Sequence, residues 1–226
     1  MMCMNLAKSF EFFDPETCKG RIHIIGCGSV GSTVAELLAR FGLTNFSLYD
    51  FDTVEEHNLV NQMFTLADVH QEKVDATLKH LIEINPEIEK CARVYPAGYE
   101  GQKLAGYVFL CVDNIDLRRK IVEENKYNDN IKAMFDFRTG LTNGQHYAAD
   151  WSKDADIRAF YDTMDFSHEE AEKNTPMSAC KVSLCVAPTV RLVSMVGVTN
   201  FVNFVKDGRL EKAVLTDPFE FNITVI

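Results

Sequence analysis

The segment GCGSVG at residues 26–31 constrains the fold of this chain more than any other feature. The short β-rich run 21–25 precedes it, and the stretch SVGSTVAELLARFG, whose apolar residues recur at helical spacing, overlaps and follows it. Glycines in such a strand-to-helix turn let backbone N–H groups meet phosphates at the positive end of a helix. The arrangement predicts a βαβ unit that binds a nucleotide; the alternative is that the glycines serve packing alone.

The order of the remaining elements predicts an α/β, Rossmann-like three-layer fold around a mixed, mainly parallel sheet that antiparallel strands extend. The apolar run YVFLCVD at 107–113 is typical of a central strand buried on both faces. Segment 143–151 alternates in polarity and is expected to turn back antiparallel. The other predicted strands are 45–52, 88–95, 131–137 and a hairpin within 210–226, and the predicted helices are 71–84, 115–127 and a long one from near Pro188.

The length of the chain favours one nucleotide-binding domain over residues 1–226. A chain of 226 residues can bury one sizeable core and is short for two. Residues 1–20 form a polar leader. Residues 152–178 are charged and polar with little periodicity, which indicates helical turns and a mobile crossover loop.

Composition excludes several classes of protein. No run of eighteen apolar residues offers a membrane span, and the first residues lack the pattern of an export signal, so we expect a cytoplasmic protein. The seven cysteines are scattered without CxxC pairs, which favours reduced thiols and argues against a structural zinc. The net charge of -10 would repel a phosphate backbone, so no nucleic-acid partner is expected.

A further set of residues narrows the expected activity. DFDTVEEHNLVNQMF at 50–64 ends the second predicted strand, Lys73 opens the next helix, and Asp113 with Asn114 follows the fourth strand. Together with GxGxxG, this set resembles the ThiF/MoeB family, the bacterial relatives of ubiquitin-activating enzymes, over residues 20–206. The resemblance implies ATP-dependent adenylation of a carboxylate with Mg²⁺, foremost the C-terminus of a small ubiquitin-like or sulfur-carrier protein. It also implies a homodimer, or a heterodimer with another ThiF-like chain.

The resemblance assigns roles position by position. Asp50 is similar to the acid that binds the ribose, Lys73 to the lysine on the triphosphate, and Asp113 to the acid associated with magnesium and catalysis. Cys180, eight residues before Pro188, is similar to the thiol that precedes the long helix and would accept the activated group. The implied nucleotide-binding set is Gly26, Gly28, Gly31, Asp50, Asp52, Asn58, Asn61 and Gln62, and the implied catalytic set is Lys73, Asp113 and Cys180.

Each assignment competes with a structural role. Lys73 alone would be read as a solvated surface lysine, Asp113 as the cap of the following helix, and Asn58 as a turn residue. Free cysteines are often inert and buried, and Cys185 is an alternative to Cys180. Arg138 is expected either to bind substrate or to pair with an acid.

The chain also departs from the family pattern. Asn61 stands where the family has an arginine in NLxRQ, which removes a fixed cation from the place where the departing phosphates should lie. The arginine-bearing leader helix and the paired CxxC motifs are absent. The main alternative is therefore a catalytically degenerate subunit of a heterodimer. A tRNA-modifying branch and an NAD-dependent dehydrogenase are further alternatives.

Overall fold

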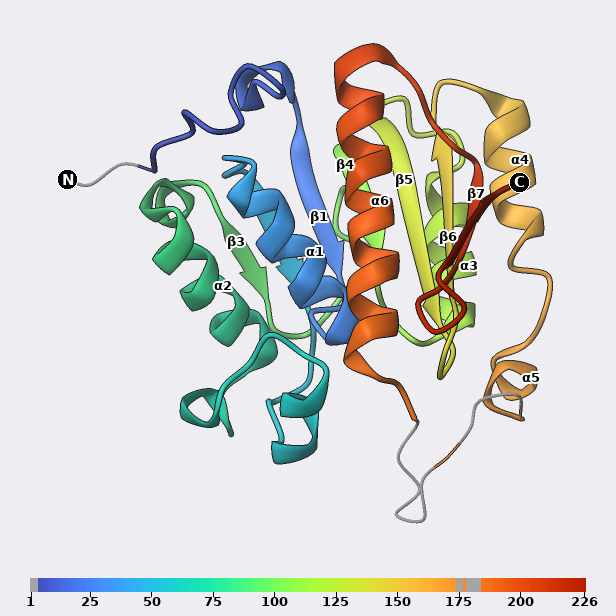
Figure 1. Ribbon diagram of the computed structural model, residues 1–226. Helices are drawn as coiled ribbons and strands as arrows, with labels where there is room; N and C mark the ends of the chain where they lie inside the picture. The colour runs from blue at the N-terminus through green and yellow to red at the C-terminus, as the bar shows by residue number, and fades with distance from the viewer. Residues whose placement is uncertain (1–3, 174–176, 178–183) are drawn as a thin grey trace.

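An eight-stranded sheet forms the centre of the computed structural model (Figure 1). The structure describes residues 4–173, 177 and 184–226. The strands lie in the order β3-β2-β1-β4-β5-β6-β7-β8. Their bounds are β1 (Arg21–Ile25), β2 (Phe46–Tyr49), β3 (Arg93–Tyr95), β4 (Gly106–Leu110), β5 (Ile131–Thr139), β6 (Gly144–Asp150), β7 (Ala213–Asp217) and β8 (Asn222–Val225).

Strand direction divides the sheet into two parts. Strands β3, β2, β1, β4 and β5 are parallel, and β6, β7 and β8 continue the sheet antiparallel from β5. The chain leaves β1 toward β2 and β3, and then returns to β4 on the other side of β1. The boundary between β1 and β4 is therefore the topological switch point, where ligands bind in open α/β sheets. The predicted mixed sheet is confirmed.

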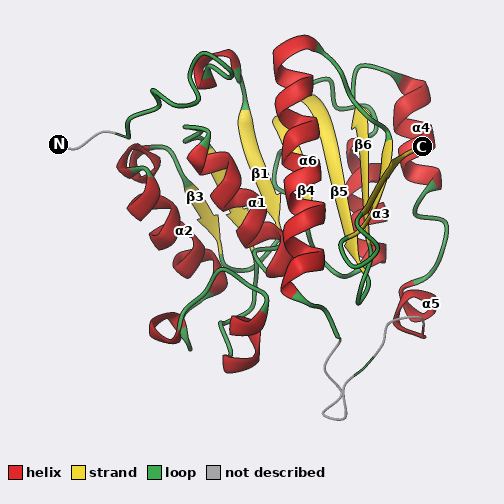
Figure 2. Ribbon diagram, in the orientation of Figure 1, coloured by secondary structure: helices red, strands yellow, loops and turns green. Residues whose placement is uncertain are grey.

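Helices cover both faces of the sheet (Figure 2). On one face, α1 (Ser29–Arg40), α2 (Lys73–Ile84) and α6 (Ala187–Asp207) share an apolar core with residues such as Ile24 and Phe109. On the other face, α3 (Ile115–Asn125) and α4 (Asp154–Asp162) pack on Val108 and Leu110. The remaining elements are α5 (His168–Lys173) and the short 3-10 helices η1 (Pro15–Thr17), η2 (Glu56–Val60), η3 (Leu66–Asp68) and η4 (Pro86–Lys90).

Two predicted strands are shorter than the sequence suggests. The third does not begin at residue 88, because Pro86–Lys90 form η4 and only 93–95 pair with β2. Asn85 caps η4, since its side chain accepts a hydrogen bond from the Glu87 N–H. The fourth ends at Leu110, so residues 111–113 lie in the loop beyond it. Asp113 thus follows the strand rather than closing it.

The charged region 152–178 contains more regular structure than its composition indicates. Its predicted helical turns are α4 and α5 within the described residues. Ile157 and Phe160 on α4 are buried in the core behind the sheet. Among the described residues, none of the helices combines the length with the hydropathy that a bilayer-spanning segment requires.

Two histidines are buried in this core, and neither forms an ion pair within the described residues. His146 on β6 is fully buried, its Nδ1 lies 3.1 Å from the Asp136 carbonyl oxygen, and its Nε2 faces the Asn200 amide at 3.0 Å. His23 on β1 contacts the Tyr49 hydroxyl and the Ala105 carbonyl. Burial lowers the pKa of each histidine to about 4. The folded chain therefore favours their neutral forms.

These pKa shifts predict a loss of stability in acid. The histidine pKa is near 6.5 in the unfolded chain, so between pH 6.5 and 4 unfolding takes up protons, and stability present above that window falls as pH decreases. Each histidine contributes a slope of about 1.4 kcal/mol per pH unit. We expect His146→Gln to remove about half of this slope, measured by denaturation at several pH values. His70→Asn, at an exposed residue of positive φ, is the control; equal slopes for all three proteins would contradict the assignment.

Candidate active site

A cleft of about 610 Å³ lies at the carboxyl ends of β1 and β4, at the topological switch point. It is formed by the glycine loop, the 50–62 segment, the start of α2 and the loop that follows β4. Leu184 and Cys185, just before α6, close another part of the wall. The cleft brings together most of the residues predicted from sequence: Gly26, Gly28, Asp50, Asp52, Asn58, Asn61, Gln62, Lys73 and Asp113.

Three glycines shape the loop between β1 and α1, each for a different reason. Gly26 has φ +96, and a Cβ there would lie 2.8 Å from the Cys111 backbone. Gly31 does not line the cleft; a Cβ there would stand 1.7 Å from the Gly26 carbonyl oxygen, so it allows α1 to approach β1. A Cβ on Gly28 would meet nothing within 4 Å, so this position opens toward the cleft. The loop thus leaves the first N–H groups of α1 accessible to an anion.

Asp50 ties the glycine loop to the end of β2. One carboxylate oxygen accepts a hydrogen bond from the Cys27 N–H at 2.6 Å, and the other accepts from the Asp52 N–H at 2.9 Å. Burial raises the pKa of Asp50, and the hydrogen bonds from these amides oppose that rise. The carboxylate therefore has a structural function in the free protein, and its predicted contact with a ribose stays a prediction.

Lys73 is not a solvated surface residue. It is the first residue of α2, only 7% of it is exposed, and its Nζ donates to Asp52 Oδ2 at 2.7 Å. The Lys73 N–H also donates to the Asp52 carbonyl oxygen, so both ends of the pair are held by backbone. Among the described residues that line the cleft, Lys73 is the one lysine or arginine. Its Asp52 partner is half exposed and is available to yield to a bound anion.

The loop from Glu55 to Met63 is organised by amide side chains. Asn58 is buried, and its Oδ1 accepts from the Glu55 N–H at 2.9 Å in a capping box, so it organises this turn, while its predicted contact with the nucleotide stays a prediction. Asn61 Nδ2 donates to the Cys185 carbonyl oxygen at 3.0 Å, which joins this loop to the segment before α6. Gln62 Oε1 is buried and has no hydrogen-bond partner among the described residues.

Asp113 stands at the cleft with its carboxylate exposed. The expectation that it might instead cap α3 is wrong, because Asn114 is the N-cap and its Oδ1 accepts from the Leu117 N–H at 2.9 Å. No group of three His, Cys, Asp or Glu side chains suited to a metal occurs in the described part of the chain. Asp113 therefore belongs to no such group, and it lines the same cleft as Lys73.

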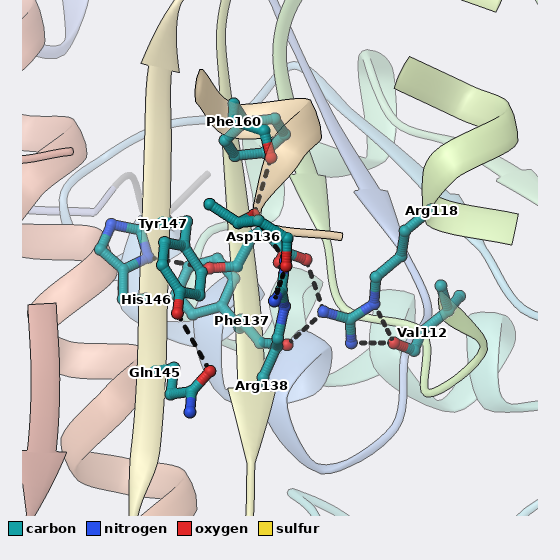
Figure 3. Close-up of polar contacts among 10 residues, drawn as sticks. Val112, Arg118, Asp136, Phe137, Arg138, Gln145, His146, Tyr147 and Phe160 are labelled. Atoms are coloured by element: carbon teal, nitrogen blue, oxygen red, sulfur yellow. Dashed lines mark hydrogen bonds and ion pairs between the residues drawn. The ribbon is translucent and has the colours of Figure 1, made fainter. Parts of the chain in front are cut away.

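A buried ion cluster supports the wall behind Asp113 (Figure 3). Asp136 on β5 is fully buried between two arginines: Arg118 NH1 donates to Oδ1 at 2.5 Å, and Arg138 Nε donates to Oδ2 at 2.7 Å. Arg118 also donates to the carbonyl oxygens of Val112 and Phe137. Because Val112 precedes Asp113, the cluster holds the backbone that presents the carboxylate. Sequence reasoning missed Arg118 and Asp136, although the acid partner of Arg138 was one of its two alternatives.

Arg138 extends this cluster toward α4. It donates to the backbone carbonyl and the hydroxyl of Thr163, which caps α4, and its guanidinium lies 4.5 Å from the centre of the Tyr147 ring. All of its hydrogen bonds within the described residues are therefore to the protein's own groups. Arg138 is therefore a member of the ion cluster, and it is not among the residues that line the cleft.

The sequence profile of the ThiF family matches residues 16–224. The chain belongs to the ThiF family. It is 43% identical over 67 residues to ubiquitin-like modifier-activating enzyme 5 of Arabidopsis thaliana, covering 30% of this chain and 16% of that protein. It is 28% identical over 134 residues to the enzyme of that name from Culex quinquefasciatus, covering 52% and 33%. This ThiF-family chain thus matches a third or less of the length of these relatives.

Solved structures share the fold of this ThiF-family chain. E. coli MccB in complex with ATP has a TM-score of 0.68 and 16% identity, covering 94% of this chain and 65% of that one. PaaA has a TM-score of 0.69 and 15% identity, covering 93% and 64%. At this level of identity the likeness shows the fold alone. The predicted family and the predicted Rossmann-like architecture are both confirmed.

The thiol prediction remains open in this ThiF-family chain. Cys180 lies outside the described residues. Cys185, the alternative, lines the cleft and is half buried, and burial raises the pKa of its thiol. Hydrogen bonds from Thr139 and Asn61 oppose that rise. A thiol with a raised pKa is a weak nucleophile at neutral pH, so the surroundings of Cys185 do not favour it as the acceptor.

Two glycine substitutions separate packing from ligand approach. Gly31→Ala should lower the stability of the free protein by more than about 2 kcal/mol, because its Cβ would collide with the Gly26 carbonyl oxygen. Gly28→Ala should change that stability by less than about 1 kcal/mol and reduce the stabilisation that ATP produces. Thermal unfolding with and without ATP measures both. Equal ATP-induced shifts in wild type and Gly28→Ala would rule out phosphate approach at this loop.

The ion cluster predicts that replacing one oxygen atom of Asp136 by an amide nitrogen lowers the stability of the protein strongly. Asp136→Asn keeps the side-chain shape and leaves two buried guanidinium groups without their carboxylate, which should lower the free energy of unfolding by about 3–5 kcal/mol. Asp129→Asn, at an exposed residue, should change it by less than about 0.5 kcal/mol. Urea denaturation compares the two. A loss below about 1 kcal/mol for Asp136→Asn would show that the cluster is not a principal support of the cleft wall.

Proposed function

We propose that this chain uses ATP to adenylate a carboxylate, and that the carboxylate is the C-terminus of a small ubiquitin-like or sulfur-carrier protein. The observation that carries the proposal is the convergence of the glycine loop, Lys73 and Asp113 on one cleft in a ThiF-family chain. ATP would place its phosphates at the start of α1, where unpaired backbone N–H groups and the helix dipole favour anions. Asp50 and its neighbours would line the part of the cleft that holds the ribose.

The reaction requires little covalent chemistry from the protein. A carboxylate oxygen attacks the α-phosphorus of ATP, the bond from that phosphorus to the bridging oxygen breaks, and pyrophosphate leaves with the electron pair. Catalysis then depends on positioning and on positive charge around the phosphates. Lys73 is placed to supply such charge once Asp52 releases it, since the half-exposed Asp52 can be solvated by water.

Mg²⁺ fits the residues present. Magnesium in nucleotide sites is typically held by one or two carboxylates together with waters and phosphate oxygens. Asp113 is an exposed carboxylate on the cleft wall and would hold the ion, which would neutralise phosphate charge. Arg118 would keep the Asp113 backbone in place through the Val112 carbonyl.

The choice of substrate follows from the similar proteins. Two of the relatives carry a name that states activation of ubiquitin-like modifiers, and solved MccB structures contain MccA. A protein or peptide carboxylate is therefore the substrate class we propose. We also infer that Cys180 is a candidate acceptor after adenylation, that the chain acts as a dimer, and that it works in the cytoplasm, where ATP is available.

One observation favours a second function. The Asn61 amide is turned to the Cys185 carbonyl and supplies no cation to the cleft. A subunit with this change could bind ATP and act as the structural half of a heterodimer with another ThiF-like chain. That function predicts no turnover until the second chain is added, and carrier-dependent turnover by the isolated protein would eliminate it.

Pyrophosphate exchange tests the proposed function. We expect the purified chain, with Mg²⁺ and carrier-like proteins, to exchange labelled pyrophosphate into ATP, and Asp113→Asn to lower that rate by about 10²-fold or more. Asp116→Asn, an exposed acid in the first turn of α3, is the matched control and should leave the rate unchanged. Absence of exchange with every carrier, alone and with a second ThiF-like chain, would refute the proposal. NADH rather than ATP raising the melting temperature would point to a dehydrogenase.

A further inference from the structure

Arg191 is a cation that has no counter-ion among the described residues. It lies in the second turn of α6, and it is partly buried between that helix and α1. Its NH1 contacts the Thr33 hydroxyl oxygen at 2.5 Å and the Met63 sulfur atom. No carboxylate of the described residues forms an ion pair with it. A thioether is a weak acceptor, so the guanidinium is poorly satisfied in the free protein.

The surroundings of Arg191 favour an anion beside its guanidinium, yet no described carboxylate pairs with it. The guanidinium lies within the first two turns of α6 and, through Thr33, of α1. The start of α6 carries partial positive charge, which disfavours a cation and favours an anion. The protein as a whole has a net charge of -10, so acids were available to pair with this arginine and none of the described ones does. The pattern is that of a site whose anion is supplied by a ligand.

Arg191 lies directly behind the phosphate-facing part of the cleft. The Thr33 hydroxyl donates to the carbonyl oxygen of Ser29, and Ser29 lines the cleft. These two residues are four apart on α1, which is about 6 Å along a helix axis. On the other side, Met63 follows Gln62, which also lines the cleft and has a buried, unpartnered Oε1. Thr33 therefore connects Arg191 to Ser29 of the cleft lining, and Met63 connects it to Gln62.

The cleft needs a second cation. Lys73 is the one lysine or arginine on its described lining, and it is neutralised by Asp52 at 2.7 Å. A leaving pyrophosphate develops charge that a single paired lysine compensates poorly. Asn61, beside Gln62, is held by the Cys185 carbonyl and is uncharged. Arg191 is a cation that contacts this loop, through the sulfur atom of Met63.

We propose that Arg191 is a second polyphosphate-binding cation of this chain, beside Lys73: it rests on Thr33 and Met63 in the free protein, and its side chain moves by about 6 Å toward the start of α1 when a polyphosphate binds. The inference rests on the proposed function, which it deepens by naming the group that replaces a cation at Asn61. Both of its resting contacts are to neutral groups, so an entering anion displaces weak interactions. The expected ligand feature is the β- and γ-phosphates rather than the nucleoside.

Binding of inorganic tripolyphosphate, ATP and AMP to the purified full chain tests this inference. We expect Arg191→Met to weaken tripolyphosphate and ATP binding by about 10- to 100-fold, the effect of losing a charge-assisted hydrogen bond, and to change AMP binding by less than about twofold. Arg191→Lys should be intermediate. Arg209→Met, an exposed arginine just beyond the far end of α6, is the control and should match wild type. Calorimetry gives all the affinities.

A rescue variant separates this role from simple packing. Asn61→Arg places a guanidinium on the cleft wall, and in the Arg191→Met background it should restore most of the lost tripolyphosphate affinity. Arg191→Met should also leave the melting temperature of the ligand-free protein unchanged or slightly higher, because it removes, near the start of α6, a cation that has no counter-ion among the described residues. Such results would support a ligand-directed arginine, since a packing role would lower the melting temperature and would not be rescued from position 61.

Other results would overturn the inference. Equal tripolyphosphate affinities for wild type and Arg191→Met would do so, and so would failure of wild type to bind tripolyphosphate. A lower melting temperature for ligand-free Arg191→Met, with unchanged polyphosphate binding, would assign the residue to helix packing. Arginine-dependent polyphosphate binding without any pyrophosphate exchange would uphold the role of Arg191 while the proposed adenylation fails.

Discussion

The close approach of α1 to the end of β1 is the constraint on which the rest of the site depends. It exists because Gly31 has no Cβ where the Gly26 carbonyl oxygen lies. With α1 at this distance, its first N–H groups face the cleft, and α2 and α6 can both pack against it on the same face of the sheet. The segments that carry Lys73 and Asn61 are positioned through those helices, so one missing methyl group determines the geometry of several polar residues.

The contacts of each carboxylate in this protein depend on how deeply it is buried more than on the total number of acids. The chain has an excess of acids, yet the fully buried carboxylate of Asp136 faces two arginines, and the carboxylate of Asp50 is occupied by backbone N–H groups. The acids left exposed at the cleft, Asp52 and Asp113, are those suited to exchange partners with a ligand or a metal. The fold thus gives its buried carboxylates several donors and leaves the exposed carboxylates of the cleft with few or none.

Local patterns in the sequence predicted most of the fold. The glycine turn, the helical periodicity before Gly42 and the alternation in residues 143–151 each specify an element from neighbouring residues, and the structure confirms them. One prediction failed where a local cap decided the outcome, because Asn85 and Pro86 start a 3-10 helix where an extended strand was expected. At α3 the cap is Asn114, which removes the structural alternative for Asp113. The strand pattern alone does not contain that information.

Long-range contacts explain what sequence could not supply at the site. Arg118 meets Asp136 across 18 positions, and Asn61 meets Cys185 across 124. No spacing rule links such residues, since the sheet order and the crossover bring them together. The resemblance to the ThiF family located the cleft residues because it carries that three-dimensional information implicitly. It could not indicate Arg191, whose contacts with Thr33 and Met63 exist only in the folded chain.

The strand order also sets the sequence in which the molecule can assemble. The two walls of the cleft follow β1 and β4, which pair directly although Arg21 and Gly106 are 85 positions apart. The hairpins of β5 with β6 and of β7 with β8 join neighbouring segments and close short loops. Because closing long loops is entropically unfavourable and slows folding, the hairpins should form early and the cleft late. During synthesis, the first βαβ unit emerges before β4, the strand that completes the cleft, so the edge of β1 that pairs with β4 stays exposed until β4 has been made.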